Sequence, residues 1–111
     1  MSVEETLAWH RRIIEVCLRL EVGFWWRDRG TFLISGEGAQ RVVTELVAQG
    51  ERVIGLDGFE LESYFISPRL DRIFDADRAP ASDPVAVLGS WDERMWVHVQ
   101  LARTPGPVAE A

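Results

Sequence analysis

The sequence is poor in the residues that form disulfides and zinc sites. Cys17 is its only cysteine, so no internal disulfide can form and nothing demands an oxidising compartment. It also has no cysteine pair and no His-x-x-x-His spacing, which argues against a zinc site. We therefore expect neither a metal nor any other cofactor.

Long apolar runs are also missing. The longest uninterrupted apolar stretches are only a few residues, too short to cross a bilayer. The first residues, Met1 to Glu5, lack the basic start and apolar run of a secretory signal. The expected location is therefore the cytoplasm.

Positive charge is scarce and of one kind. Twelve basic residues, all of them arginines, stand against 18 acidic ones, for a net charge of −6. Nucleic acids and anionic membranes attract clustered cations, so neither is an expected partner. An acidic chain suits a basic protein partner, although a net charge of this size also simply keeps a small domain soluble.

The sequence does hold enough apolar material for a core. Hydrophobic residues make up 47% of the 111 residues, and five tryptophans and five phenylalanines are among them. Aromatic side chains bury large areas, so a few can supply much of a small core. We expect one domain over residues 1–103, with residues 104–111 as a disordered tail.

The first half of the chain predicts two helices around a hairpin. Ser2 and Glu5 form a capping box at the start of an amphipathic helix over 2–20. The aromatic and β-branched residues of 22–34, interrupted by Asp28-Arg29-Gly30, predict a hairpin. Apolar residues with helical spacing predict a second helix over 38–49, with Gly50 as its C-cap.

The second half predicts shorter elements. We expect a strand over 52–56, then a turn at Asp57-Gly58 and a second strand over 59–62. Residues 64–66 either continue the second strand or return along it after a turn at Glu62-Ser63. Ser67-Pro68 and Asp83-Pro84 each match a helix cap followed by proline, which predicts helical turns over 68–74 and a short helix up to about Trp91. Residues 75–82 fit a loop and 95–101 a final strand. This order predicts an α+β fold: one mostly antiparallel sheet, packed by the N-terminal helix and the helix at 38–49.

Catalytic candidates are weak. Cys17 falls in the apolar arc of the first helix, where a cysteine is usually a small hydrophobic residue. His10 is two helical turns from Cys17, and His98 could approach only through tertiary packing. Glu60 and Glu62 share a strand face, but alternating charge there is ordinary. We therefore expect no catalysis.

Ligand-binding motifs are incomplete as well. Asp71, Asp75 and Asp77 resemble part of a calcium loop but lack its glycine and distal glutamate. The Gly-rich segment 35–38 lacks the remaining residues of a phosphate-binding loop, and Glu37 would repel phosphate. A solvated acidic turn and a simple helix start explain both segments better.

A protein-recognition surface is the remaining possibility. Six acids fall within 21 residues, and two adjacent tryptophans on a strand point to opposite faces, so that one of them is expected to be exposed. An exposed tryptophan near acids is typical of a binding hot spot. The candidate partner-binding residues are Asp57, Glu60, Glu62, Asp71, Asp75, Asp77, Trp25 and Trp26. Equally, both indoles could be covered and the acids merely solvated.

Three segments carry a family resemblance. Residues 53–61 have a Gly-x-x-Gly-Phe pattern, residues 66–75 a Pro-x-x-Asp step, and residues 95–99 read Met-Trp-Val-His-Val. Together they resemble small immunity proteins of bacterial polymorphic toxin systems. The resemblance implies a non-catalytic inhibitor that binds one cognate toxin, and an acidic inhibitor would suit a basic nuclease toxin. The alternatives are a homodimeric structural or regulatory module and a small-molecule binder with an aromatic pocket.

Overall fold

The computed structural model describes residues 3–26, 32–61 and 66–102. These residues form helices and strands in the order α1 (Val3–Leu20), β1 (Phe24–Trp26), β2 (Phe32–Ser35), α2 (Gly36–Ala48), β3 (Val53–Leu61), β4 (Ile66–Asp75), α3 (Pro84–Gly89) and β5 (Trp96–Leu101). None of the helices in these ranges combines the length and the apolar character that a membrane span requires.

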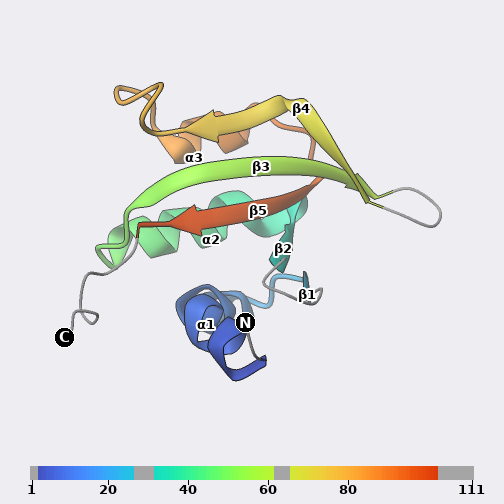
Figure 1. The fold of residues 1–111 in the computed structure, drawn as a ribbon, viewed down its shortest axis with the longest axis vertical. Helices are drawn as coiled ribbons and strands as arrows, with labels where there is room; N and C mark the ends of the chain where they lie inside the picture. Colours follow the sequence, from blue (N-terminus) through green and yellow to red (C-terminus); the bar gives the residue numbers. More distant parts are fainter. Residues whose placement is uncertain (1–2, 27–31, 62–65, 103–111) are drawn as a thin grey trace.

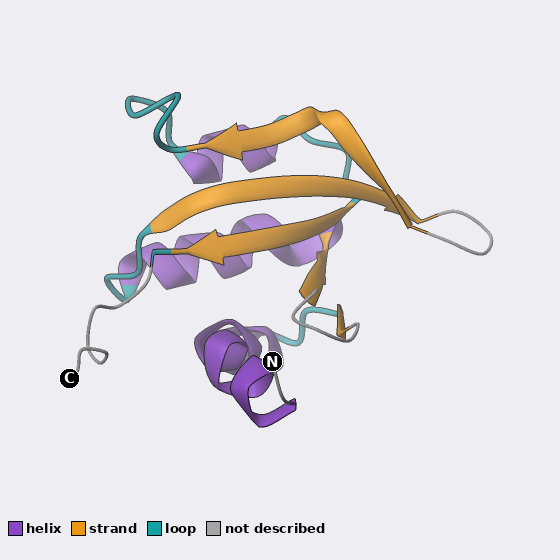
Figure 2. Cartoon of the chain, viewed as in Figure 1, coloured by secondary structure: helices purple, strands orange, loops and turns teal. Residues whose placement is uncertain are grey.

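The strands form one antiparallel sheet in the order β1-β2-β5-β3-β4 (Figure 1). Helices α2 and α3 pack on one face of the sheet, and the opposite face of β3 and β4 is left uncovered by helices (Figure 2). α1 lies beside β5, where the ring of His10 is 6.5 Å from that of His98. The predicted α+β class, with a mostly antiparallel sheet, is confirmed.

The core lies between the sheet and the helices. Alternate residues of the central strands, such as Leu56, Val97 and Val99, are buried with the apolar faces of α1 and α2. At the surface, Arg19 of α1 contacts Glu45 of α2 at 3.0 Å. Its hydrogen bond lowers the pKa of the Glu45 carboxyl. Apolar burial therefore packs the two helices together, and this exposed ion pair adds little to it.

The boundaries of α2 have local causes. The helix begins at Gly36 rather than at the expected Gly38, and the Gly36 N–H, which has no partner within the helix, donates to the Met95 carbonyl at 2.8 Å. At the other end Gly50 has φ of +91°, its N–H donates to Val47 O, and the Glu51 N–H donates to Leu46 O. This pair of bonds is a Schellman motif, so the expected glycine cap is confirmed.

The expected turn at Asp57-Gly58 is wrong. β3 continues through both residues, and a β-bulge with a shift of register lies between them. A Cβ on Gly58 would collide with Met95 Cε and lie 2.9 Å from Arg72 Cβ. The glycine therefore serves close packing and not a turn. Leu61 pairs with Ile66, so the chain returns between them instead of continuing the strand.

The expected helical turns over 68–74 are also wrong. Residues 66–75 form β4, an outer strand paired only with β3. Pro68 is tolerated because an edge strand can lack one backbone donor. Gly58 pairs with Arg69 and Asp57 with Ile73, so the intervening residues 70–72 bulge out of the ladder.

The remaining elements agree with the sequence where they are described. β1 and β2 pair as an antiparallel hairpin, and β5 occupies most of the expected final strand. Asp83 caps α3 by accepting a hydrogen bond from the Val85 N–H at 3.0 Å. The helix ends at Gly89 and not near Trp91. Three expectations fall outside the described residues: the capping box at Ser2, the turn at 28–30 and the tail at 104–111.

Candidate protein-binding surface

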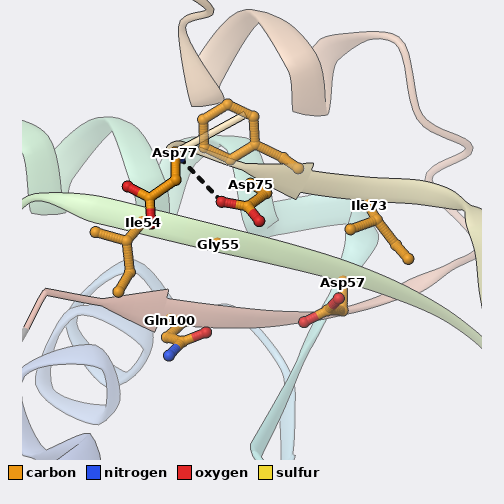
Figure 3. A pocket seen from close by; sticks show the side chains of 8 residues that line it. Ile54, Gly55, Asp57, Ile73, Asp75, Asp77 and Gln100 are labelled. Carbon is orange, nitrogen blue, oxygen red and sulfur yellow. Dashed lines mark hydrogen bonds between the residues drawn. The ribbon is translucent and has the colours of Figure 1, made fainter. Parts of the chain in front are cut away.

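A shallow acidic groove lies on the sheet face opposite α2 and α3. It has a volume of about 290 Å³ and is lined by Ile54, Gly55, Asp57, Ile73, Phe74, Asp75, Asp77 and Gln100. Figure 3 shows the carboxylates of Asp75 and Asp77 next to each other, with Asp57 farther along β3. Gly55 leaves the floor of the groove without a side chain.

The groove carboxylates have little countercharge. Arg78 lies 3.9 Å from Asp75, and its side chain is 89% exposed, so solvent screens the attraction. Neither Asp57 nor Asp77 forms an ion pair with any described residue. The Asp77 backbone N–H donates to Asp75 Oδ1 at 2.9 Å, which orders the turn after β4. A region of negative potential therefore faces solvent.

Two of the other predicted acids, Glu60 and Asp71, form ion pairs with arginines. Asp71 accepts two hydrogen bonds from Arg69, at 3.0 and 2.9 Å, and contacts Arg72 at 3.1 Å. The Arg69 hydrogen bond holds the pKa of Asp71 below its usual range. Glu60 lies 3.2 Å from the same Arg69. The acidic stretch therefore falls into a free group, Asp57, Asp75 and Asp77, whose one ion pair with a described residue is the contact of Asp75 with the exposed Arg78, and a compensated group, Glu60 and Asp71. Glu62 lies outside the described residues.

The tryptophans are not part of this groove. Trp25 is 42% exposed, so one exposed indole is confirmed, but it lies on β1 at the opposite edge of the sheet from β4. Three strands separate these edges, which puts them about 19 Å apart at normal strand spacing. The side chain of Trp26 lies outside the described part. Trp25 and the acids therefore do not form one contiguous hot spot.

A second hollow, which the sequence did not predict, lies on the outer side of β4. It has a volume of about 410 Å³ and is lined by Leu70, Ile73, Phe74, Asp75, Arg78, Ala79, Ser82 and Val87. Leu70 is 80% exposed and Ile73 is 53% exposed. The expected helical turns over 68–74 did not indicate this surface, because it depends on residues 66–75 forming an edge strand.

The catalytic candidates have unfavourable surroundings. Cys17 is fully buried, and burial raises the pKa of its thiol to about 11, so the nucleophilic thiolate is suppressed. The Glu60 carboxylate forms an ion pair with Arg69 at 3.2 Å. The amide of Gly36, which a phosphate would need at the start of α2, donates to Met95. No group of three or more metal-ligating side chains that could hold a metal ion occurs in the described ranges.

His98 is the remaining chemically distinctive group near the groove. It pairs across the sheet with Asp57, and burial lowers its pKa although the Asp57 charge acts in the opposite direction. The charge of the neighbouring His10 also lowers the pKa of His98. The His10 ring stacks on Phe32, with 5.3 Å between the ring centroids. The histidine is therefore held mainly neutral at pH 7.

Comparison with known proteins found no matching family model, no matching curated protein and no matching solved structure.

Proposed function

We propose that this chain is a non-catalytic protein-binding module of the immunity type, which inhibits a bacterial toxin by binding a basic segment of it in the acidic groove. The observation that supports the proposal is the group of three carboxylates, Asp57, Asp75 and Asp77, around one open groove. Among the described residues their one ion pair is the 3.9 Å contact of Asp75 with the exposed Arg78.

Physical chemistry favours a cationic occupant. Arginine side chains form strong charge-assisted hydrogen bonds with carboxylates, and adjacent carboxylates can accept several at once. The net charge of −6 adds a long-range field that speeds encounter with a basic protein. The resemblance of residues 53–75 and 95–99 to immunity proteins points to the same kind of partner. No tryptophan lines either hollow, so the small-molecule alternative gains no support from an aromatic pocket.

The proposal is tested by comparing two variants with equal kinds of change. Asp57→Asn/Asp75→Asn/Asp77→Asn removes the free carboxylates, and Glu60→Gln/Asp71→Asn removes carboxylates that arginines already compensate. Tagged wild-type protein first captures a partner from a lysate of the source organism. The affinity of each variant for that purified partner is then measured by titration calorimetry.

The triple variant should bind at least about tenfold more weakly than wild type, and the double variant should bind nearly as well as wild type. Expression of the partner alone should be toxic, and co-expression with this chain should remove the toxicity. Equal affinities of the triple variant and wild type, or a partner that is harmless when expressed alone, would contradict the proposal.

A further inference from the structure

The outer side of β4 carries apolar side chains that no other described part of the chain covers. Leu70, on the bulge, and Ile73, just after it, are both exposed large apolar residues. They flank a hollow whose wall is completed by Ala79 and by Val87 of α3. Exposed apolar groups that cluster around a hollow mark an interaction site more often than scattered ones do.

Whatever occupies this surface must bind by its side chains and not by extending the sheet. Pro68 has no N–H to donate to an added strand. Residues 70–72 bulge out of the ladder, which interrupts the extended backbone that an added strand would need. The outer edge is therefore protected from continuous strand pairing. A binding partner would instead be held by a side chain that enters the hollow.

The charges at the hollow favour an occupant that carries both signs. Asp75 and Arg78 line the same hollow, and Arg78 extends far into solvent. The nearby Asp71 is neutralised by Arg69 and Arg72. A purely basic segment would meet Arg78, and a purely acidic one would meet Asp75. A second copy of this chain offers an arginine for the aspartate and an aspartate for the arginine.

We propose that two copies of this chain associate through this surface as a two-fold dimer. The Leu70 side chain of each copy enters the hollow of the other, and Arg78 of each copy faces Asp75 of the other. Such a contact is self-complementary, as a two-fold interface requires. Specific dimers bury on the order of 800 Å² per copy, so the contact extends from β4 over the 76–82 turn and α3. Asp75 lines both hollows and Asp77 lies in the 76–82 turn, so the dimer surface borders the acidic groove, whereas Leu70 lines the outer hollow alone. The dimer contact is made by Leu70, Asp75 and Arg78 and does not depend on the toxin-binding proposal.

The first test is the mass in solution, measured by sedimentation equilibrium from about 1 µM to about 1 mM, where contacts of this kind associate. Wild type should pass from monomer to dimer in this range. Leu70→Ser should weaken the dimer by about a hundredfold, because both copies lose an anchor and each buried leucine contributes on the order of tenfold. Leu18→Ser is the matched control, since Leu18 is 64% exposed on α1 and lines neither hollow.

The second test exchanges the charges between copies. Arg78→Glu alone and Asp75→Arg alone should each weaken the dimer, because like charges then meet across the two-fold axis. An equimolar mixture of the two variants should associate as wild type does, since both pairs become attractive in the mixed dimer.

A monomeric mass for wild type at every concentration would overturn the proposal, and so would a Leu70→Ser variant that dimerises like wild type. A charge-variant mixture that stays monomeric would also overturn it. Leu70→Ser separates this proposal from the inhibitor function, because Leu70 lines only the outer hollow: it should lose the dimer and keep toxin binding.

Discussion

Asp57 on β3 stands directly opposite His98 on β5, and its carboxylate acts on the pKa of that histidine. Burial lowers the pKa of His98 below its ordinary value of 6.5, whereas the Asp57 carboxylate opposes that shift. Asp57 also lines the acidic groove, so the groove and the buried histidine are electrostatically coupled.

Stability should fall as the solution is acidified through the range where unfolded histidine titrates. Because the pKa of His98 is lower in the folded state, the unfolded chain takes up the proton first. The stabilisation from the neutral side chain is therefore complete above pH 6.5 and is lost as the pH falls below it. We expect the urea midpoint of wild type to decrease between about pH 7.5 and about pH 5.5, and that of His98→Gln to decrease less.

The acidic groups whose pKa values are lowered by arginines titrate below the pH range of this measurement. The pKa values of Asp71 and Glu45 are lowered by Arg69 and Arg19, from ordinary values of 3.8 and 4.5. Their contributions remain intact above pH 4.5 and disappear only at lower pH. Equal slopes for wild type and His98→Gln above pH 5 would show that His98 is not the titrating group.

Cys17 should be unreactive in the folded protein. Its side chain points from α1 into the core and is completely buried. Its pKa of about 11 leaves almost no thiolate at pH 8. An aromatic disulfide reagent should label it slowly in buffer and completely in concentrated urea. Rapid labelling of the native protein would mean that α1 detaches readily, and would reopen a nucleophilic role for this thiol.

The aspartate cap should stabilise α3. Asp83→Ala removes the carboxylate that accepts from the Val85 N–H and should lower the free energy of unfolding by about 1 kcal/mol. Ser82→Ala, one residue earlier, is the control and should change it little. Because Val87 of this helix lines the outer hollow, the same variant should also weaken the proposed dimer. Equal stability of the two variants would argue against the cap.

The sequence predicted elements whose signals are local. α2 follows from apolar residues at helical spacing and a glycine that ends it, and both signals act within one helix. The cap at Asp83 and the aromatic hairpin are local in the same way. These elements, together with the final strand, were sufficient to predict the α+β class.

β4 was missed because its local signal was ambiguous. Ser67-Pro68 matches the cap-then-proline pattern that correctly marks α3 at Asp83-Pro84, but proline is also tolerated on an edge strand. Only pairing with β3, which no local pattern reveals, decides between the two structures. The division of the acids into free and compensated groups depends on that pairing too, because it brings Arg69 toward Glu60.

Among the glycines in the strands, Gly58 is the one where substitution should lower the stability most. An alanine there would place its Cβ against Met95 Cε, which can move, and 2.9 Å from Arg72 Cβ, which is fixed to the β4 backbone at the bulge. β4 would have to shift, and overpacking of this kind costs about 1–3 kcal/mol. Gly58→Ala should therefore lower the free energy of unfolding by that amount in urea titrations.

Gly23→Ala is the matched control for this substitution. A Cβ on Gly23 meets only Ser35 Cβ, at the ordinary distance of 3.8 Å. Its free energy of unfolding should stay within about 1 kcal/mol of wild type, because alanine also restricts the unfolded chain. If Gly58→Ala proved as stable as this control, the close packing of β3, β4 and Met95 would be wrong.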